Sequence, residues 1–349
     1  MDRDFIKRYW FLAVLILLIP VGIFAPDAGL VLKKSNWVIP VFVGIMLGIA
    51  GFTMDTSRLV KQATNFRAVL PVLASIYVFA PAAAFGLAKL FAPEDDAEFI
   101  AAMMIMAAQA GSLASGIALT MMAGGNRELA LICTLLANGL TVVLTPFILK
   151  LSIGAEVDFS MGKMILRMAY MILLPIAAGQ LLRRFIWEKT ESIQPVIRVV
   201  PQFIILLFVY TGFASGADQL QNNSDIVLRF LAACALLHML MLGWNLLVSG
   251  LLGLNWPDRT AVILCGSQKT LPNGIYIWDT FFMRHGNVPA AITHVPFGAV
   301  PLVLYHLVQL LVDTLLVSRL EKVNPKSDET SSTEEPSAGC HVGGKTGVH

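Results

Sequence analysis

The chain has 349 residues, of which 56% are hydrophobic and only 14% are charged. Soluble domains carry roughly 25% charged residues, so this balance excludes an ordinary soluble enzyme and favours a protein embedded in lipid. The formal net charge of +2, without a basic cluster interleaved with aromatic residues, argues against a nucleic-acid partner. The sequence shows no disulfide or zinc spacing, nucleophile elbow or phosphate-binding loop, so no catalytic residue is predicted.

The apolar residues arrive in blocks, most of them about 17 to 28 residues long. Each block is long enough for a helix that crosses a hydrocarbon core about 30 Å thick. In chain order, we predict helices over residues 9–25, 36–54, 66–92, 98–124, 127–153, 161–186, 195–217, 224–253, 259–284 and 289–318. The predicted fold class is an all-α integral membrane protein with about ten transmembrane helices. The lipid bilayer is thus a required partner, and the oligomeric state stays open.

The charges between the predicted helices orient the bundle. Fifteen Lys and Arg residues lie on the side of the two termini and eight on the opposite side, which makes both termini cytoplasmic by the positive-inside rule. We predict a cytoplasmic N-terminus over residues 1–8, five-helix repeats over 9–155 and 156–320, and a disordered cytoplasmic tail over 321–349. The short loops favour a bacterial inner membrane.

Polar and flexible residues interrupt two of the predicted helices. The fourth helix is interrupted within residues 109–125 and the ninth within residues 266–274. Pro272 lacks a backbone donor and lies between glycines of low helix propensity, so a continuous ninth helix is not expected. Unwound backbone is tolerated in a membrane only where protein or a water-filled cavity satisfies it, so we predict a binding site at the interruptions.

The two interruptions occupy corresponding places in the chain. Their centres, near Ser115 and Leu271, are 156 residues apart, and the first and sixth helices begin 152 residues apart, at Tyr9 and Met161. Two five-helix halves, each with a broken fourth helix, account for both offsets, and an odd number of helices in each half makes the repeats inverted. Alternatively, the small residues only allow close packing of helices.

Three stretches at these positions resemble the bile acid:sodium symporter superfamily, and most closely its branch typified by the seventh member of solute carrier family ten. They are Ser115-Gly-Ile-Ala-Leu-Thr120 with Ala123-Gly-Gly-Asn126, Cys265-Gly-Ser-Gln-Lys-Thr-Leu271 with Gly274, and Val300-Pro-Leu-Val-Leu-Tyr-His306 with Gln309. The resemblance extends over roughly residues 9–318. It implies a core of helices three to five and eight to ten that crosses at the broken helices. A panel of helices one, two, six and seven would move against this core.

The resemblance also implies a sodium site, since relatives of the bile-acid type bind sodium beside the crossing. Ser115, Thr120, Thr134 and Asn138 fall where the ligands of those relatives cluster, and hydroxyl and carbonyl oxygens suit a hard cation. A sodium ion is the one cofactor that is indicated. Those relatives also place a carboxylate in the ninth helix, whereas this chain has Lys269 there, and an ammonium repels a sodium ion that shares its pocket.

Lys269 is the one basic residue predicted at the centre of a transmembrane helix, where a charge costs at least about 2.5–3.5 kcal/mol. Its ammonium could replace a sodium ion on the carbonyls and hydroxyls of the interruption. It could instead pair with an anionic solute, or exchange protons and so couple transport to them. The fourth interpretation is a lysine that only holds the broken helix together.

In the tenth helix, Tyr305, Gln309 and Asp313 follow at i,i+4 spacing and share one face, which we expect to point inward. Isolated polar residues such as His238, Asn245 and His294 are interpreted as satisfied by neighbouring helices. The predicted solute-binding residues come from both interruptions and from the tenth helix: Gln109, Ser112, Ser115, Gly116, Gln268, Lys269, Thr270, Asn273, Gly274, His306 and Gln309.

The sequence therefore predicts a secondary active transporter that moves a small organic anion or amphipathic acid by alternating access, driven by sodium or protons. The positive N-terminal ends of half-helices suit an anion. The alternative is a membrane regulator or scaffold that keeps a transporter-like fold without transporting. Polar residues at both interruptions favour the transporter, because a scaffold has no need of costly buried polarity.

Overall fold

In the computed structural model, the described residues are 3–35, 37–54, 64–154, 160–215, 217, 221, 224–283 and 296–323. Within these ranges the chain forms helices and turns but no strand. The helices are α1 (Arg3–Phe24), α2 (Asp27–Lys34), α3 (Val38–Thr53), α5 (Phe66–Ala74), η2 (Ser75–Phe79), α6 (Ala80–Phe91), η3 (Pro93–Asp95), α7 (Ala97–Ala107), α8 (Leu113–Met122), α9 (Arg127–Ile153), α10 (Met161–Met168), η4 (Ala169–Leu173), α11 (Leu174–Ile186), η5 (Glu188–Ile193), α12 (Gln194–Ser215), α14 (Ser224–Leu251), α15 (Trp256–Ser267), α16 (Leu271–Ile277), η6 (Trp278–Met283), η7 (Pro296–Gly298) and α17 (Ala299–Val323).

Five helical stretches are long and apolar enough to cross a membrane: Phe66–Phe91, Arg127–Ile153, Met161–Ile186, Ser224–Leu251 and Ala299–Leu320. Shorter apolar helices cover Ala13–Phe24, Val38–Thr53, Ala97–Ala107 and Val199–Ser215. The chain is a multi-pass helical membrane protein. The boundary predicted between the repeats, His294 and residues 324–349 of the predicted tail lie outside the described residues.

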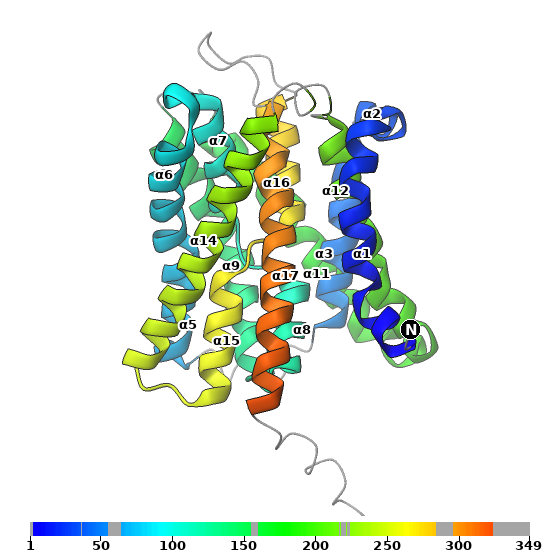
Figure 1. Ribbon diagram of the computed structural model, residues 1–349. Helices are drawn as coiled ribbons and strands as arrows, with labels where there is room; N and C mark the ends of the chain where they lie inside the picture. Colours follow the sequence, from blue (N-terminus) through cyan, green and yellow to red (C-terminus); the bar gives the residue numbers. More distant parts are fainter. Residues whose placement is uncertain are drawn as a thin grey trace, which may run out of the picture.

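The helices form two groups with α16 and α17 between them (Figure 1). On one side, α1, α2, α3, α11 and α12 pack on one another. On the other side lie α5, α6, α7, α9, α14 and α15. α17 packs against α14 of the second group and against α1 and α12 of the first, while α16 contacts α3 and α12. These two helices therefore join the groups.

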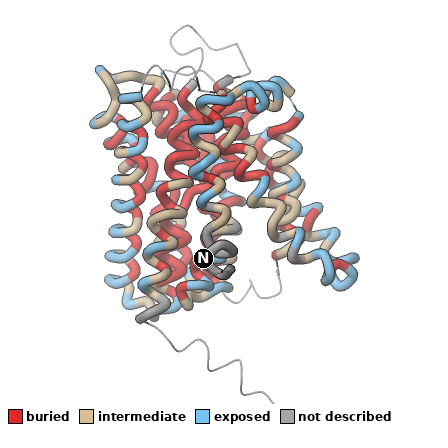
Figure 2. Tube along the Cα trace, turned by 45° about the vertical axis from the view of Figure 1, so that its right-hand side comes forward, coloured by how far each residue is buried: buried red, intermediate tan, exposed pale blue. Residues whose placement is uncertain are grey.

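The outward faces of the bundle are apolar. Buried residues lie where helices face one another, and the outer surfaces are exposed (Figure 2). Phe24, Leu90, Leu151 and Leu251 have exposed fractions of 76%, 72%, 78% and 79%. Apolar surface of this extent is typical of contact with lipid.

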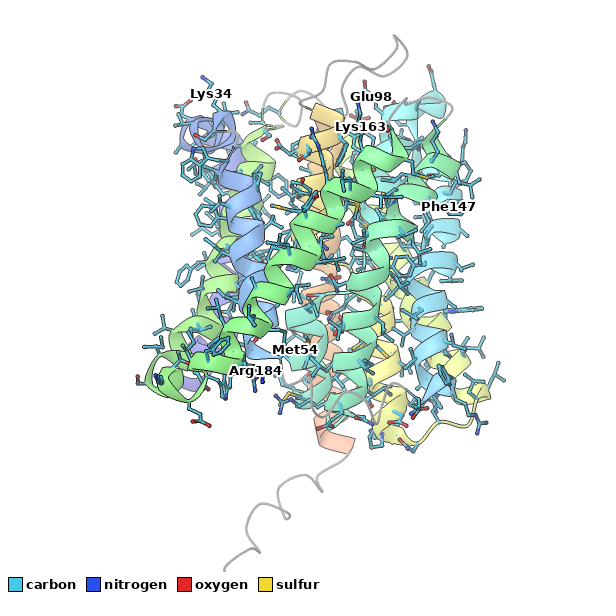
Figure 3. All side chains as sticks on the ribbon, turned by 180° about the vertical axis from the view of Figure 1, so that it is seen from behind. Lys34, Met54, Glu98, Phe147, Lys163 and Arg184 are labelled. Carbon is cyan, nitrogen blue, oxygen red and sulfur yellow. The ribbon has the colours of Figure 1, made fainter. Side chains whose placement is uncertain are left out.

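Charged residues lie at the two ends of the bundle. Figure 3 shows Lys34, Glu98 and Lys163 at one end, Arg184 near the other, and Phe147 on the outer flank between them. Lys34 follows the first predicted helix, Lys163 lies near the start of the sixth and Arg184 near its end, so the sequence predicts Lys34 and Lys163 on the side opposite Arg184, as in this view. Which end faces the cytoplasm stays a prediction.

The first interruption is present, but it lies earlier than its predicted centre. α7 ends at Ala107 and α8 begins at Leu113, so Ser115 and its neighbour Gly116 lie inside a helix. The reason is a local cap: the side chain of Ser112 accepts a hydrogen bond from the backbone N–H of Ser115 at 3.4 Å, which starts α8. The unwound segment is therefore 108–112.

The second interruption is also shorter than predicted. α15 ends at Ser267 and α16 begins at Leu271, which leaves only residues 268–270 unwound. Pro272 stands in the first turn of α16, where a missing backbone N–H costs nothing because that donor has no partner within the helix. Pro272 therefore starts the new helix, and Asn273 and Gly274 are helical.

Candidate functional site

The two unwound segments lie against each other, and we call residues 108–112 and 268–270 the crossing. The backbone N–H of Thr270 donates to the carbonyl oxygen of Ala110 at 2.8 Å. A Cβ on Gly111 would lie 3.1 Å from the carbonyl oxygen of Cys265, so the two backbones approach closely there. The crossing thus joins polar backbone from both halves of the chain inside an apolar bundle.

Lys269 binds the crossing through its ammonium. The side chain is only 2% exposed, and its Nζ donates to the carbonyl oxygens of Ala107 at 2.7 Å, Ile76 at 2.8 Å and Gln109 at 2.9 Å. An ammonium has three protons, so each one has an acceptor. All three acceptors are backbone carbonyls, which fits both an ammonium that replaces a metal cation and a lysine that only holds the broken helix together.

These carbonyls are available because regular helix stops or loosens around them. Ala107 is the last residue of α7 and Gln109 lies beyond it, where carbonyls lack partners within the helix. Ile76 belongs to the π-helical turn η2, in which the ordinary i to i−4 ladder is disturbed. Irregular backbone on two helices therefore makes a pocket of oxygens for one cation.

Gln309 on α17 satisfies the unwound backbone at Lys269. Its Oε1 accepts from the Lys269 N–H at 2.8 Å, and its Nε2 donates to the Lys269 carbonyl at 3.0 Å. The same Nε2 lies 2.9 Å from Nδ1 of His306, which therefore accepts its second proton. Gln309 and His306, both predicted for the site, are thus placed at the crossing by the last helix.

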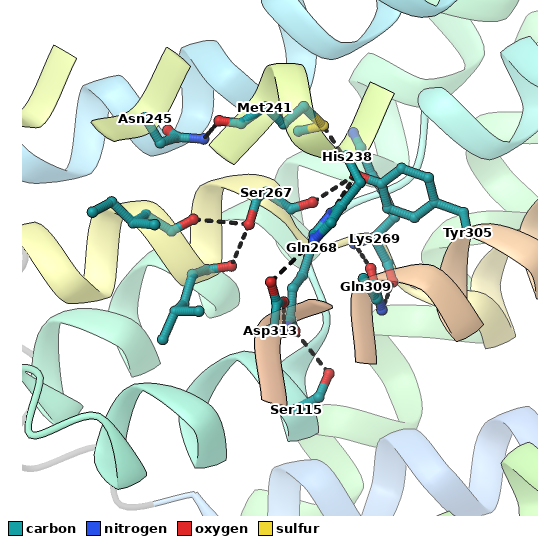
Figure 4. Close-up of polar contacts among 12 residues, drawn as sticks. Ser115, His238, Met241, Asn245, Ser267, Gln268, Lys269, Tyr305, Gln309 and Asp313 are labelled. Carbon is teal, nitrogen blue, oxygen red and sulfur yellow. Dashed lines mark hydrogen bonds and ion pairs between the residues drawn. The ribbon is translucent and has the colours of Figure 1, made fainter. Parts of the chain in front are cut away.

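A second polar network extends from the crossing to α14 (Figure 4). The hydroxyl of Ser115 donates to Oε1 of Gln268 at 2.7 Å, and Nε2 of Gln268 donates to Asp313 at 2.7 Å. The other oxygen of Asp313 lies 3.0 Å from Nε2 of His238. Nδ1 of His238 lies 3.3 Å from the Tyr305 hydroxyl. Both side chains of the His238–Asp313 pair are 0% exposed.

The oxygens predicted for sodium lie beside the crossing. The hydroxyls of Thr120 and Thr134 donate to carbonyls one turn back, at 2.7 and 2.8 Å, and Nδ2 of Asn138 donates to the Gly111 carbonyl at 3.0 Å. Hydroxyl oxygens that donate keep lone pairs for a cation, so the oxygen chemistry suits sodium. The ammonium of Lys269 nevertheless occupies carbonyls only two residues from Gly111. The sodium site stays a prediction.

The other predicted solute-binding residues are buried at or near the crossing. Nδ2 of Asn273 lies 3.4 Å from Oδ1 of Asn138, and Nε2 of Gln109 donates to the Ile105 carbonyl at 2.6 Å. Gly274 packs so closely on Leu302 of α17 that a Cβ would collide with it. Buried polar atoms without a hydrogen-bond partner in the described part of the chain include Oε1 of Gln109, Oδ1 of Asn273 and Nε2 of His306.

Sequence reasoning missed the membership of His238 in this network. The partners of His238, Asp313 and Tyr305, do lie on a neighbouring helix, α17, as the sequence interpretation expects, but the sequence does not show that they connect to the crossing. A signal was present: Cys234, His238, Met241, Asn245 and Ser249 follow at spacings of four and three residues and are all buried on one face of α14. Asn245 binds the Ser75 hydroxyl at 2.8 Å. No group of three or more His, Cys, Asp or Glu suitable for a metal occurs among the described residues.

Comparisons with known proteins relate the chain to a family of transporters. A model of the SBF-like CPA transporter family matches residues 9–322. The chain is 29% identical over 317 residues to an uncharacterized protein of Pseudomonas aeruginosa, which covers 88% of this chain and 92% of that protein. It is 23% identical over 323 residues to the sodium/bile acid cotransporter 7 of Mus musculus, covering 90% and 93% of the two chains. The Rattus norvegicus protein of the same name is 22% identical over 324 residues, covering 90% and 93%.

Proposed function

Because the chain belongs to the SBF-like CPA transporter family, we propose that it is a secondary active transporter that moves a small organic anion or amphipathic acid by alternating access. The observation that carries the proposal is the crossing, where unwound backbone and buried polar side chains meet inside apolar helices. Such irregular backbone at membrane depth is a mark of substrate and ion sites in transporters. The names of the mammalian relatives, which refer to bile acid, support the solute class.

The proposed architecture is two inverted five-helix repeats, with ten transmembrane helices in all. The grouping of the helices supports it, since α1, α3, α11 and α12 would form the moving panel and α5 to α9 with α14 to α17 the core. α16 begins directly after the second interruption, α17 carries Gln309, and both helices contact the panel helix α12. Movement of the panel along these two helices would expose the crossing to one side of the membrane and then to the other.

Unpartnered polar atoms support a solute at the crossing. Gln109, Asn273 and His306 are each at most 3% exposed, and each has one polar atom without a hydrogen-bond partner in the described residues. Such atoms are rare in folded proteins because each costs free energy. We propose that a bound solute or water completes their hydrogen bonds. The N-terminal end of α8, at Ser112, and the charge of Lys269 would favour an anion there.

The proposed role of Lys269 is that of a built-in cation. Its ammonium sits on three carbonyls of the kind that would otherwise bind a metal ion, and it brings positive charge to the solute site. Coupling to a gradient of sodium or protons is part of the proposal, and the oxygens of Ser115, Thr120, Thr134 and Asn138 are the predicted sodium ligands. The names of the mammalian relatives refer to sodium, which supports testing it first.

The test is uptake of a panel of radiolabelled organic anions, bile acids included, into vesicles that contain the purified full-length protein. Each anion is offered with an inward sodium gradient, an inward proton gradient or neither. The matched variants are Lys269→Ala and, as a control with an exposed hydroxyl on α17, Ser318→Ala. We expect accumulation of at least one anion by the unmodified protein and by Ser318→Ala, and none by Lys269→Ala.

The outcomes separate the proposals. Accumulation driven by sodium would support the predicted sodium ligands. Accumulation driven by protons would mean that a different, proton-binding group couples transport to the gradient. Absence of uptake of every anion under every gradient would contradict transport. If an anion still raised the melting temperature of the protein in that case, the regulator would become the better proposal.

A further inference from the structure

The number of protons in the network around His238 follows from its hydrogen-bond partners. The Tyr305 hydroxyl lies 2.7 Å from the carbonyl oxygen of Ser267, and a carbonyl can only accept. A phenol has a single proton, and the Ser267 carbonyl is its nearest acceptor, since Sδ of Met241 lies farther away, at 3.2 Å. Towards Nδ1 of His238, at 3.3 Å, the Tyr305 oxygen must therefore accept. A hydrogen bond at this contact then requires a proton on Nδ1 of His238.

The opposite side of the ring then requires one more proton. Nε2 of His238 faces a carboxylate oxygen of Asp313 at 3.0 Å, and the hydrogen bond between them needs a proton on the nitrogen or on the oxygen. If it is on the nitrogen, His238 is an imidazolium; if it is on the oxygen, Asp313 is a neutral acid. In both cases the His238–Asp313 pair holds one proton more than a neutral imidazole and a carboxylate hold together. The pair is then electrically neutral, as its full burial favours.

We propose, on the basis of the transport function proposed above, that the His238–Asp313 pair is the proton-binding site that couples transport to a proton gradient. The pair takes one proton from water on one side of the membrane and releases it to water on the other side. No bond other than those to this proton is made or broken. Lys269 meanwhile keeps the built-in positive charge at the crossing.

Loss of the proton would change the second interruption directly. With the proton gone, Asp313 is ionised and the remaining ring proton stays on Nε2, so Nδ1 becomes an acceptor. The Tyr305 hydroxyl would then turn from the Ser267 carbonyl to Nδ1. Ser267 is the last residue of α15, so its carbonyl stands at the edge of the crossing. The hydrogen bond from Tyr305 to the end of α15 would therefore form only when the pair holds its proton.

Gln268 provides a second connection between the pair and the crossing. Its amide donates to Asp313 at 2.7 Å, and its carbonyl accepts from Ser115 on α8 at 2.7 Å. A change of charge on Asp313 therefore acts on a side chain that joins both broken helices. The sodium oxygens predicted at Thr120, Thr134 and Asn138 form no hydrogen bond with the pair.

Other titratable groups near the pair are few. Tyr305 and Cys265 interact electrostatically with Asp313, and Cys234 interacts with Tyr305. The ammonium of Lys269 binds the carbonyls of Ile76, Ala107 and Gln109, and His306 binds Gln309. From the remaining elements packed on α14 and α17, Tyr77 of η2 binds the Ala137 carbonyl and Asp258 of α15 binds asparagines. Within the described residues, the pair is therefore the group of this network suited to exchange a proton.

The first test measures the proton itself and does not depend on transport. The full-length protein, labelled with ¹⁵N-histidine, is placed in lipid vesicles, and the ring nitrogens of His238 are identified by the signals that His238→Gln removes. Solid-state NMR distinguishes protonated from unprotonated ring nitrogens. We expect the spectrum to show a proton on Nδ1 of His238 and to show its loss when the pH of the sample is raised. An Nδ1 without a proton throughout, or one that never releases it, would overturn the proposal.

The second test measures coupling. In vesicles, an inward proton gradient should drive accumulation of a transported anion by the unmodified protein, and His238→Gln and Asp313→Asn should abolish it. Exchange of the anion at equal pH on both sides needs no net proton movement, so the accumulation by each variant is divided by its own rate of exchange, and this ratio should fall. The control is Ser249→Ala on the same buried face of α14. Undiminished proton-driven accumulation by His238→Gln would overturn the proposal.

The two tests also separate this inference from the proposed function. If His238 titrates as expected but no anion moves under any gradient, the transport function and the coupling role both fall, while proton binding by the pair stands. If transport is driven by sodium alone and His238 does not titrate, the transporter stands and the proton site falls.

Discussion

The side-chain amide of Gln309 binds the backbone of Lys269 on both sides: it accepts from the Lys269 N–H at 2.8 Å and donates to the Lys269 carbonyl at 3.0 Å. A neighbouring β-strand would make the same two hydrogen bonds. A backbone residue in the middle of a membrane has no water to bind, so the amide replaces the partners that a helix would have supplied. The pairing fixes the backbone of the residue whose ammonium reaches the first interruption. One side chain of α17 therefore stabilises the contact between the two broken helices.

Gln309→Ala should destabilise the protein strongly. It leaves a buried N–H and a buried carbonyl without partners, and each such group costs about 1–3 kcal/mol. The measurement is the midpoint of thermal unfolding of the purified protein in detergent. Ser318→Ala, which removes an exposed hydroxyl from the same helix, should change stability by less than about 0.5 kcal/mol. Equal midpoints for the two variants would contradict the role of Gln309.

Lys269→Ala should make the protein depend on small cations. The substitution leaves the carbonyls of Ile76, Ala107 and Gln109 without their donor and opens a space the size of the lost side chain. A small ammonium or sodium ion that entered the space would restore part of the lost interaction. We expect methylammonium or sodium chloride to raise the melting temperature of the variant, and choline chloride to leave it unchanged. The melting temperature of the unmodified protein should change equally in all three salts. If the melting temperature of Lys269→Ala also changed equally in all three salts, a cation-binding role for these oxygens would be excluded.

Gly111→Ala should be more harmful than Gly116→Ala. A Cβ on Gly111 would lie 3.1 Å from the backbone oxygen of Cys265, which cannot move without displacing α15. On Gly116 the nearest atoms are side-chain atoms of Gln268, Cys265 and Thr134, at 3.4 to 3.6 Å, which is ordinary contact. Overpacking at Gly111 should cost about 1–3 kcal/mol in thermal unfolding experiments. The reverse order of stability would show that the two backbones do not approach closely at the crossing.

Asp258→Ala should loosen one end of the bundle. The Asp258 carboxylate accepts from the side chains of Asn126 at 2.6 Å and of Asn65 and Asn255 at 3.3 Å each. It thereby joins the starts of α5, α9 and α15. Hydrogen bonds to a charged group are worth about 1.5–3 kcal/mol, so the short contact alone should lower stability measurably.

The control for Asp258→Ala is an exposed carboxylate. Asp225→Ala removes a residue whose side chain is 70% exposed and whose nearest cation, Arg229, is 3.9 Å away. Surface pairs of this kind contribute at most about 1 kcal/mol. Hydrogen exchange should increase at the first turns of α5, α9 and α15 in Asp258→Ala only. An equal pattern of exchange in both variants would contradict the proposed connection.

The helical class and the two interruptions were predictable from the sequence. Long apolar blocks have only one stable form in lipid, and the glycines and Pro272 of the ninth block disfavour a continuous helix whatever surrounds them. The inward face of Tyr305, Gln309 and Asp313 was predictable too, because i,i+4 spacing fixes which side chains share a face, and all three are buried.

The partners of the polar side chains were not predictable in the same way. The acceptors of Lys269 include the carbonyl of Ile76, nearly two hundred residues away, and the accessibility of this carbonyl depends on the π-helical turn η2. The pairing of His238 with Asp313 depends on how α14 and α17 are rotated about their axes. A single sequence gives the faces of helices but not their mutual rotation, so His238 was interpreted as isolated. The predicted centre of the first interruption, near Ser115, is wrong because Ser112 caps α8 and so ends the unwound segment earlier.

Because the ammonium of Lys269 is covalently attached to the chain, it limits how much charge crosses the membrane with the solute. A metal ion bound at the same carbonyls would leave with the solute and carry its charge across the membrane, whereas Lys269 remains behind. One proton and one monovalent anion together carry no net charge. The membrane voltage, which acts with about 2.3 kcal/mol per elementary charge at 100 mV, would then neither drive nor oppose their uptake. Under the proposed coupling, with one proton for each monovalent anion, accumulation of the anion would draw on the pH difference alone, even across a depolarised membrane.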